Sequence, residues 1–164
     1  MDALSEEQWA ELSGGEEHPW GGLAEDLTWR EKERHGGLVG ADGALLAHAG
    51  TVICEIDVAG FPRFDVLGVG GVFVAPSERR KGLVGQVLEP LLAHMPGGPD
   101  RAMLFCRAQL MGLYGKHGFS EIHERVWADQ PDGRIEMPLR TMWRPLQEQA
   151  AWPAGRVDVV GLPF

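Results

Sequence analysis

The chain has 164 residues, of which 44% are hydrophobic and 24% charged, as in an ordinary globular domain rather than a disordered chain. Its net charge of −9 argues against a nucleic-acid partner, since phosphate backbones attract proteins rich in lysine and arginine. Two cysteines, Cys54 and Cys106, are too few for a disulfide scaffold, and no apolar run approaches membrane-spanning length. We expect one cytoplasmic domain with no membrane partner, and no metal, because no histidines or cysteines have ligand spacing.

Residues 1–35 are predicted to form two helices. The run Ser5 to Gln8 has the form of a capping box, and Gly14 should end the helix that it starts. A second helix is predicted to begin after Pro19, to turn Trp29 inward and to end near His35. The many acidic side chains of this segment fit solvated helix faces, and they also fit an acidic lip that steers an amine.

A β-hairpin should follow, because Asp42-Gly43 is a strong turn signal between apolar runs at residues 38–40 and 44–58. Alternation along the second run places Glu55 and Asp57 together, on the face opposite Val52, Cys54, Ile56 and Val58. Most carboxylate pairs of this kind face water, and a few lie over a cleft and act as bases.

The stretch 68–95 organises the rest of the chain. Its strand contains Gly70-Gly71, which indicates a bulge, and leads into a basic, glycine-bearing turn at residues 79–82. A helix is predicted next, because apolar residues recur there at steps of three and four. Free amides and the dipole at a helix N-terminus bind anions, so this order of elements predicts a phosphate site. The alternative is a solvated basic loop.

The remaining chain is predicted to contain a strand at 101–106, parallel to the central one because a helix connects them, and a short helix at 109–117. Residues 120–127 and 134–143 should pair antiparallel around a turn at 131–133. The tail 152–164 is apolar enough that it should pack against the domain.

Two motifs resemble the GNAT superfamily of N-acetyltransferases. The run Arg79-x-x-Gly82-x-Val84-Gly85 resembles its acyl-CoA pyrophosphate loop, with Val84 where glycine or alanine is usual, and residues 113–119 resemble its L-Y-x-x-x-G-F signature. The resemblance implies an α/β (α+β) fold with a mixed, mostly antiparallel central sheet, a splayed parallel pair and flanking helices. It also implies a single domain over 1–164, with acceptor-side helices at 1–35, a core at 36–145 and a packed tail at 146–164.

The resemblance also implies acetyl-CoA as co-substrate and a set of site residues. Tyr114 would be the general acid that protonates the departing thiolate; its alternative is an ordinary core tyrosine. The family often carries a glutamate base near Gly70, which this chain lacks, so the candidate bases are Glu55, Asp57 and Asp65. Substrate contacts are expected from Trp29, Glu55 and Phe164. The expected cofactor-binding residues are Val72, Phe73, Val74, Arg79, Arg80, Lys81, Gly82, Leu83, Val84 and Gly85.

A finer resemblance concerns His48 within Ala47-His48-Ala49, Leu83-Val84, and the tail Trp152 to Val157, which together are similar to aminoglycoside 2'-N-acetyltransferases. It implies direct transfer, in a ternary complex, to a small cationic amine, with an aminoglycoside-like antibiotic as the leading candidate and antibiotic resistance as the role. A homodimer is compatible with this prediction. The alternatives are an acyl-CoA-binding module that has lost transfer, and an enzyme that acetylates proteins or peptides.

Overall fold

The computed structural model describes residues 1–17, 20–93 and 95–164. In this part of the chain one sheet of nine strands is combined with short helices. The helices are α1 (Glu6–Ser13), α2 (Gly22–Glu25), α3 (Leu83–Leu92) and α4 (Met111–Gly115), with 3₁₀ turns at Pro76–Glu78 and Ala108–Leu110. The strands are β1 (Arg34–Val39), β2 (Leu45–Val58), β3 (Phe64–Val74), β4 (Arg101–Cys106), β5 (Ser120–Ile122), β6 (Val126–Gln130), β7 (Gly133–Glu136), β8 (Arg140–Pro145) and β9 (Val157–Val159).

The strand order is β5-β8-β4-β3-β2-β9-β6-β7, with β1 paired to β2. β5 and β6 are six positions apart in this order, which would be about 29 Å in a flat sheet. The four peptide steps from Ile122 to Val126 span at most about 14 Å, so the sheet must curl. Its pairs are antiparallel except β3 with β4 and β6 with β9. The predicted fold class, mixed and mostly antiparallel, is confirmed.

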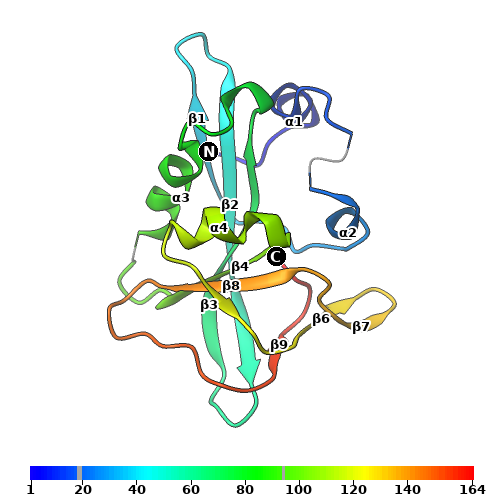
Figure 1. Ribbon diagram of the computed structural model, residues 1–164, viewed down its shortest axis with the longest axis vertical. Helices are drawn as coiled ribbons and strands as arrows, with labels where there is room; N and C mark the ends of the chain where they lie inside the picture. The colour runs from blue at the N-terminus through cyan, green and yellow to red at the C-terminus, as the bar shows by residue number, and fades with distance from the viewer. Residues whose placement is uncertain (18–19, 94) are drawn as a thin grey trace.

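Figure 1 shows β2 and β3 running along the molecule, with α3 on one side of them and α1 and α2 on the other. The apolar face of α3 packs on the upper half of these strands, in a cluster that includes Leu88, Leu91 and Val69. A second cluster fills the curled lower half. It contains Val52, Cys54, Ile56 and Val58, the β2 face predicted from alternation. No helix in the described ranges is long and apolar enough to cross a membrane.

α1 matches its prediction. The Ser5 side chain accepts a hydrogen bond from the Gln8 amide (3.2 Å), and the Gln8 side chain accepts one from the Ser5 amide (3.0 Å). Gly14 ends the helix with a φ of +62°, a conformation that favours glycine. The sequence therefore specifies both ends of this helix locally.

The second helix was predicted too long. Its expected start at Pro19 lies outside the described residues, and α2 ends at Glu25 instead of near His35. The following backbone is paired elsewhere, since the Arg30 amide donates to the Pro163 carbonyl (2.7 Å) and the Glu33 amide to the Thr51 carbonyl (2.9 Å). Tertiary pairing overrides the helical pattern here.

The C-terminal half also differs in detail from its prediction. Each of the two long strands expected at 120–127 and 134–143 is divided, so that β5 pairs with β8 and β6 with β7, in both cases antiparallel. The tail contributes β9, which inserts between β2 and β6. It ends at Phe164, whose ring is 2% exposed and lies over Gly68.

Candidate active site

A cleft of about 620 Å³ opens where β3 and β4 part. The parallel ladder of these strands ends at the pair Val69 and Leu104. Beyond it β3 continues to Val74 and β4 to Cys106, without further pairing between them. The β3 backbone on this side is therefore available to a bound molecule.

A β-bulge shapes the β3 wall of the cleft. Gly50 pairs with Gly70 and His48 with Phe73, so Ala49 alone faces the two residues between them, Gly71 and Val72. Gly71 takes a φ of +59°, which is the backbone of a bulge whose first residue is glycine. The Gly70-Gly71 pair in the sequence thus indicated this feature correctly.

The loop between β3 and α3 forms one end of the cleft. Gly82, with a φ of +77°, precedes α3 and supplies no side-chain cap. The amides of the first turn have no intrahelical partner, and the helix dipole is positive there. Arg79 and Arg80 line the cleft beside these amides. This end can therefore hold an anion such as a diphosphate.

The basic side chains of this loop differ in their surroundings. Arg79 forms an ion pair with Glu16 and lies over the ring of Phe73, 5.3 Å from its centroid. Arg80 has a φ of +68°, uncommon for a residue with a side chain, and no ion pair with a described residue. Arg80 is thus free to meet an anion, whereas the position of Arg79 is already fixed by protein contacts.

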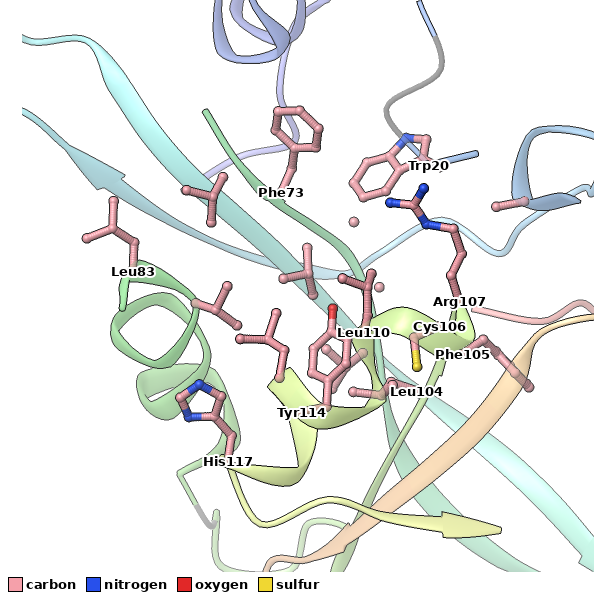
Figure 2. A pocket seen from close by; sticks show the side chains of 18 of the residues that line it. Trp20, Phe73, Leu83, Leu104, Phe105, Cys106, Arg107, Leu110, Tyr114 and His117 are labelled. Carbon is pink, nitrogen blue, oxygen red and sulfur yellow. The ribbon is translucent and has the colours of Figure 1, made fainter. Parts of the chain in front are cut away.

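Tyr114 lies in the middle of the cleft. Its side chain is 6% exposed and packs edge-on against Phe119, with the ring centroids 6.0 Å apart. Figure 2 shows its hydroxyl pointing into the cleft, where no described residue forms a hydrogen bond with it. Burial raises the pKa of Tyr114 well above its usual value, so the phenol keeps its proton at neutral pH. It can therefore act as a donor.

Cys106 lines the same part of the cleft. Burial raises the pKa of its thiol to about 11, so the thiolate needed for nucleophilic attack is scarce at neutral pH. Cys106 is therefore a buried thiol rather than a nucleophile.

The far end of the cleft is aromatic and basic. Trp29 lies 6.1 Å from Phe105, and Phe105 lies 5.1 Å from Phe164, between ring centroids. Trp20 completes the wall by stacking on Trp9, through which α1 supports the site. The guanidinium of Arg107 extends beside Trp20 (Figure 2).

Lys32 reaches this end of the cleft across two glycines. Gly50 and Gly70 face each other on β2 and β3, and the Lys32 side chain lies over both. A Cβ at Gly50 would be 2.7 Å from Lys32 Cγ, and one at Gly70 would be 2.5 Å from Lys32 Cε. The ammonium donates to the Arg30 carbonyl (2.8 Å), and burial lowers the pKa of Lys32 to about 8. Among the described lining residues Glu78, at the opposite end, has the only acidic side chain.

Most of the predicted site residues meet in this one cleft. Lys81 does not line it but pairs with Glu78 (2.9 Å). Gly85 does not line it either, yet its missing side chain makes room for His117, since a Cβ there would be 2.6 Å from His117 Cε1. Those that line the cleft are Trp29, Val72, Phe73, Val74, Arg79, Arg80, Gly82, Leu83, Val84, Tyr114 and Phe164.

The three candidate bases lie elsewhere. Arg63 binds both Glu55 (3.0 Å) and Asp57 (3.1 Å), whose side chains are 45% and 39% exposed. Asp65 pairs in register with Glu55 on the neighbouring strand and is also exposed. None of the three lines the cleft, which argues against direct proton transfer to them and against Glu55 as a substrate contact.

Sequence reasoning missed six polar or aromatic lining residues: Trp20, Lys32, Glu78, Phe105, Arg107 and His117. Arg107 directly follows β4, and the carboxyl end of a parallel strand is a common place for ligand contacts. His117 lies within the L-Y-x-x-x-G-F run, which could have indicated it. Lys32 gave no signal, because its segment was assigned to a helix.

Known proteins share this fold. A family model described as an acetyltransferase (GNAT) domain matches residues 15–122, which is 108 of the 164 residues. No curated protein matches the chain.

Three solved structures illustrate the likeness. The GNAT family N-acetyltransferase YhbS from Escherichia coli, in complex with CoA, is 17% identical over 77% of this chain and 70% of that one, with a TM-score of 0.51. The ribosomal-protein-S18-alanine N-acetyltransferase from Escherichia coli is 21% identical over 92% and 97%, with a TM-score of 0.53. N-acetylglutamate synthase from Neisseria gonorrhoeae, complexed with coenzyme A and N-acetyl-glutamate, is 16% identical over 90% and 34%, with a TM-score of 0.56. With the family match, they show that this chain belongs to the GNAT family of acetyltransferases, whose co-substrate is acetyl-CoA.

Proposed function

We propose that the chain transfers the acetyl group of acetyl-CoA directly to a small amine, with both substrates in the cleft at once. The observation that carries this is the continuity of the cleft. It joins an anion-binding helix N-terminus, the gap between β3 and β4, and the hydroxyl of Tyr114. A donor laid along it would place its diphosphate at Gly82 and its thioester beside Tyr114.

The unpaired side of β3 would hold the pantetheine arm. Val72, Phe73 and Val74 line the cleft beyond the last β3–β4 pair, so their backbone groups can bond an extended arm as a strand bonds its neighbour. The Val72 amide would donate to the thioester carbonyl and stabilise the negative charge that grows on its oxygen. Val84 is compatible with this arrangement, because backbone amides supply the contact to the diphosphate.

The reaction forms a C–N bond and breaks the C–S bond. The amine attacks the thioester carbonyl, and the departing thiolate takes a hydrogen bond or proton from Tyr114. The attacking nitrogen loses one proton to solvent as it becomes the amide nitrogen, and solvent returns a proton to Tyr114. The acceptor reacts as the free base after losing its ammonium proton to water, since no acidic side chain of a described residue lines the far end. Holding the two reactants together supplies much of the acceleration.

For the acceptor we propose a monoamine with an apolar or aromatic body. Trp20, Trp29 and Phe105 offer ring surface at the far end, while Lys32 and Arg107 are basic. Basic groups disfavour a second positive charge nearby. An aminoglycoside-like polycation, the leading candidate from the sequence, therefore gains no support from the charges of this wall.

A panel of amines tests both the acetyl transfer and the proposed monoamine acceptor. Thiol release from acetyl-CoA would be measured with arylalkyl monoamines, a polyamine, an aminoglycoside and a peptide N-terminus, and mass spectrometry would locate the acetyl group. We expect kcat/KM for the best monoamine to exceed that for the polycations at least about tenfold, a difference of about 1.4 kcal/mol. Arg107→Gln should narrow this gap, whereas Arg63→Gln, at a residue outside the cleft, should not.

The outcomes separate the alternatives. Preference for the aminoglycoside would refute the proposed acceptor but not the chemistry, and preference for the peptide would favour a protein acetyltransferase. Binding of acetyl-CoA without turnover on any amine would refute the enzyme and support an acyl-CoA-binding module.

A further inference from the structure

A chain of hydrogen bonds connects the β3 bulge to the segment before β1 through two histidines. His48 Nδ1 lies 2.8 Å from the Gly71 carbonyl oxygen, and His48 Nε2 lies 3.1 Å from His35 Nδ1. His35 Nε2 lies 3.2 Å from the Lys32 carbonyl oxygen. Gly71 and Lys32 both line the cleft, so the chain joins two parts of its wall.

The number of protons on the two histidine rings follows from the groups at the two ends of this hydrogen-bond series. Both terminal partners are carbonyl oxygens, which only accept, so His48 Nδ1 and His35 Nε2 must each carry a proton. The contact between the two rings needs one proton more. Three protons on four ring nitrogens make a pair with one positive charge, whereas a neutral pair has two protons and leaves one contact without a hydrogen.

The surroundings decide which ring carries the charge. His48 is 5% exposed, and its pKa is lowered chiefly by burial and further by the neighbouring charges of His35 and Lys32, although its bond to Gly71 acts in the opposite direction. His35 is only partly buried and bonds through both of its nitrogens. His48 is therefore an unfavourable place for a positive charge, and its proton lies on Nδ1, where the Gly71 carbonyl accepts it.

The bond from His48 also fixes a peptide that faces the cleft. The carbonyl of Gly71 and the amide N–H of Val72 belong to the same planar trans peptide and point in opposite directions. A carbonyl turned toward His48 on β2 thus turns the Val72 N–H away from β2, to the side where the cleft lies. Without this bond the bulge, with glycine at its first position, would have more freedom to rotate.

We infer, building on the proposed function, that His48 is a positioning residue that aims the Val72 amide at the thioester carbonyl, and that it shares one proton with His35. Neither imidazole needs to touch a substrate. With the pair protonated all three contacts are made, and the bulge is tied to the Lys32 segment. When the pair loses its proton as the pH rises, one of the two contacts of His35 is left without a hydrogen, and the tie between the bulge and the Lys32 segment weakens.

Two substitutions at His48 separate positioning from packing. In His48→Asn the side-chain amide can take the place of Nδ1 and still donate to Gly71, but it cannot titrate. In His48→Leu no donor remains. We expect kcat to fall about tenfold or more in His48→Leu and to stay within about threefold of wild type in His48→Asn, with little change in KM for acetyl-CoA in either.

The pH profile adds a readout that packing alone would not move. A weakly basic arylamine is the suitable acceptor, because it stays neutral across pH 6–9. Wild-type turnover should fall about fivefold as the pair loses its proton, the effect of about one hydrogen bond. His48→Asn and His35→Asn should both lack this step. Equal turnover in His48→Leu and His48→Asn, or the same pH step in all variants, would overturn the inference.

Proton counting does not need turnover. Nitrogen-15 NMR of the imidazoles should show His48 with its proton on Nδ1 throughout pH 6–9. As the pH is lowered, the two rings together should gain one proton. Two rings that titrate independently, each by one full proton, would overturn the shared proton. Failure of every amine in the turnover assay would instead refute the proposed function, while leaving this NMR result to stand or fall by itself.

Discussion

Gly68 lies beneath the ring of Phe164 and should not accept even a methyl group. A Cβ at position 68 would be 2.5 Å from Phe164 Cγ and 2.6 Å from Cδ2. Gly68 lies in β3, without a positive φ, so the backbone itself would permit alanine. Gly68→Ala should therefore destabilise the fold through this contact, although replacing glycine by alanine usually stabilises a strain-free site.

The size of the effect follows from the packing. Carbon atoms in contact lie about 3.5–4.0 Å apart, so the ring must move by about 1–1.5 Å. Phe164 is 2% exposed and contacts Phe105, and crowding of such a core costs about 1–3 kcal/mol. If the ring were expelled completely, the loss of stability would approach the roughly 3–5 kcal/mol that a Phe→Ala substitution costs in a core. We expect about 2–4 kcal/mol, a fall in Tm of about 4–16 °C.

Thermal and urea unfolding of four proteins would test this reasoning: wild type, Gly68→Ala, Phe164→Ala and the double variant. Because Phe164→Ala removes the colliding ring, Gly68→Ala should cost less than about 1 kcal/mol in that background. Gly112→Ala is the matched control, since a Cβ there meets no atom within 4 Å. It should change stability by no more than about 1 kcal/mol. A Gly68→Ala protein within about 2 °C of wild type, or strictly additive effects, would refute the packing argument.

Three further predictions concern local interactions. Ser5→Ala removes the capping box of α1 and should lower the free energy of unfolding by about 1 kcal/mol; unchanged urea denaturation would contradict it. Hydrogen bonds from Arg144 lower the pKa of Glu89, so this pair stabilises the fold above the unfolded pKa of about 4.3 and loses its effect as pH falls through the lower folded pKa. Glu89→Gln should thus cost up to about 1 kcal/mol at pH 7 and nothing near pH 2, and a pH-independent cost would contradict this. Burial raises the pKa of Cys54 and of Cys106 to about 11, so neither thiol should react quickly with a disulfide reagent until denaturant is added; a rapid native reaction would show that one is accessible.

Local features of the fold could be predicted because their signals are complete within a few residues. Ser5 and Gln8 cap one another, and the alternation over 52–58 identifies the buried face of β2. The turn at Asp42-Gly43 also lies where the β1–β2 hairpin has it. In each case the interacting groups are neighbours in the sequence, so no tertiary information was needed.

Features set by distant segments could not be predicted. Residues 26–33 are not helical because Pro163 and Thr51 accept hydrogen bonds from their backbone, and nothing near them in the sequence indicates those partners. Glu55 and Asp57 were placed on the correct face, but whether a face borders a cleft depends on how the sheet curls.

The residues of the candidate site likewise fall into those that local sequence could identify and those that depend on distant segments. The Gly82 loop and Tyr114 could be identified because their motifs carry the chemistry in short, ordered runs. Lys32 could not, because its place over Gly50 and Gly70 depends on the pairing of β2 with β3. The bond between His35 and His48 likewise requires the β1–β2 register.

In the proposed mechanism the Tyr114 hydroxyl assists the departure of coenzyme A from the gap between β3 and β4. Tyr114→Phe removes only that oxygen from a side chain that is otherwise packed in the core. We expect kcat to fall about 10²-fold or more, while calorimetry shows the Kd for coenzyme A within about twofold of wild type. A Tyr114→Phe protein that turns over at the wild-type rate would contradict the account.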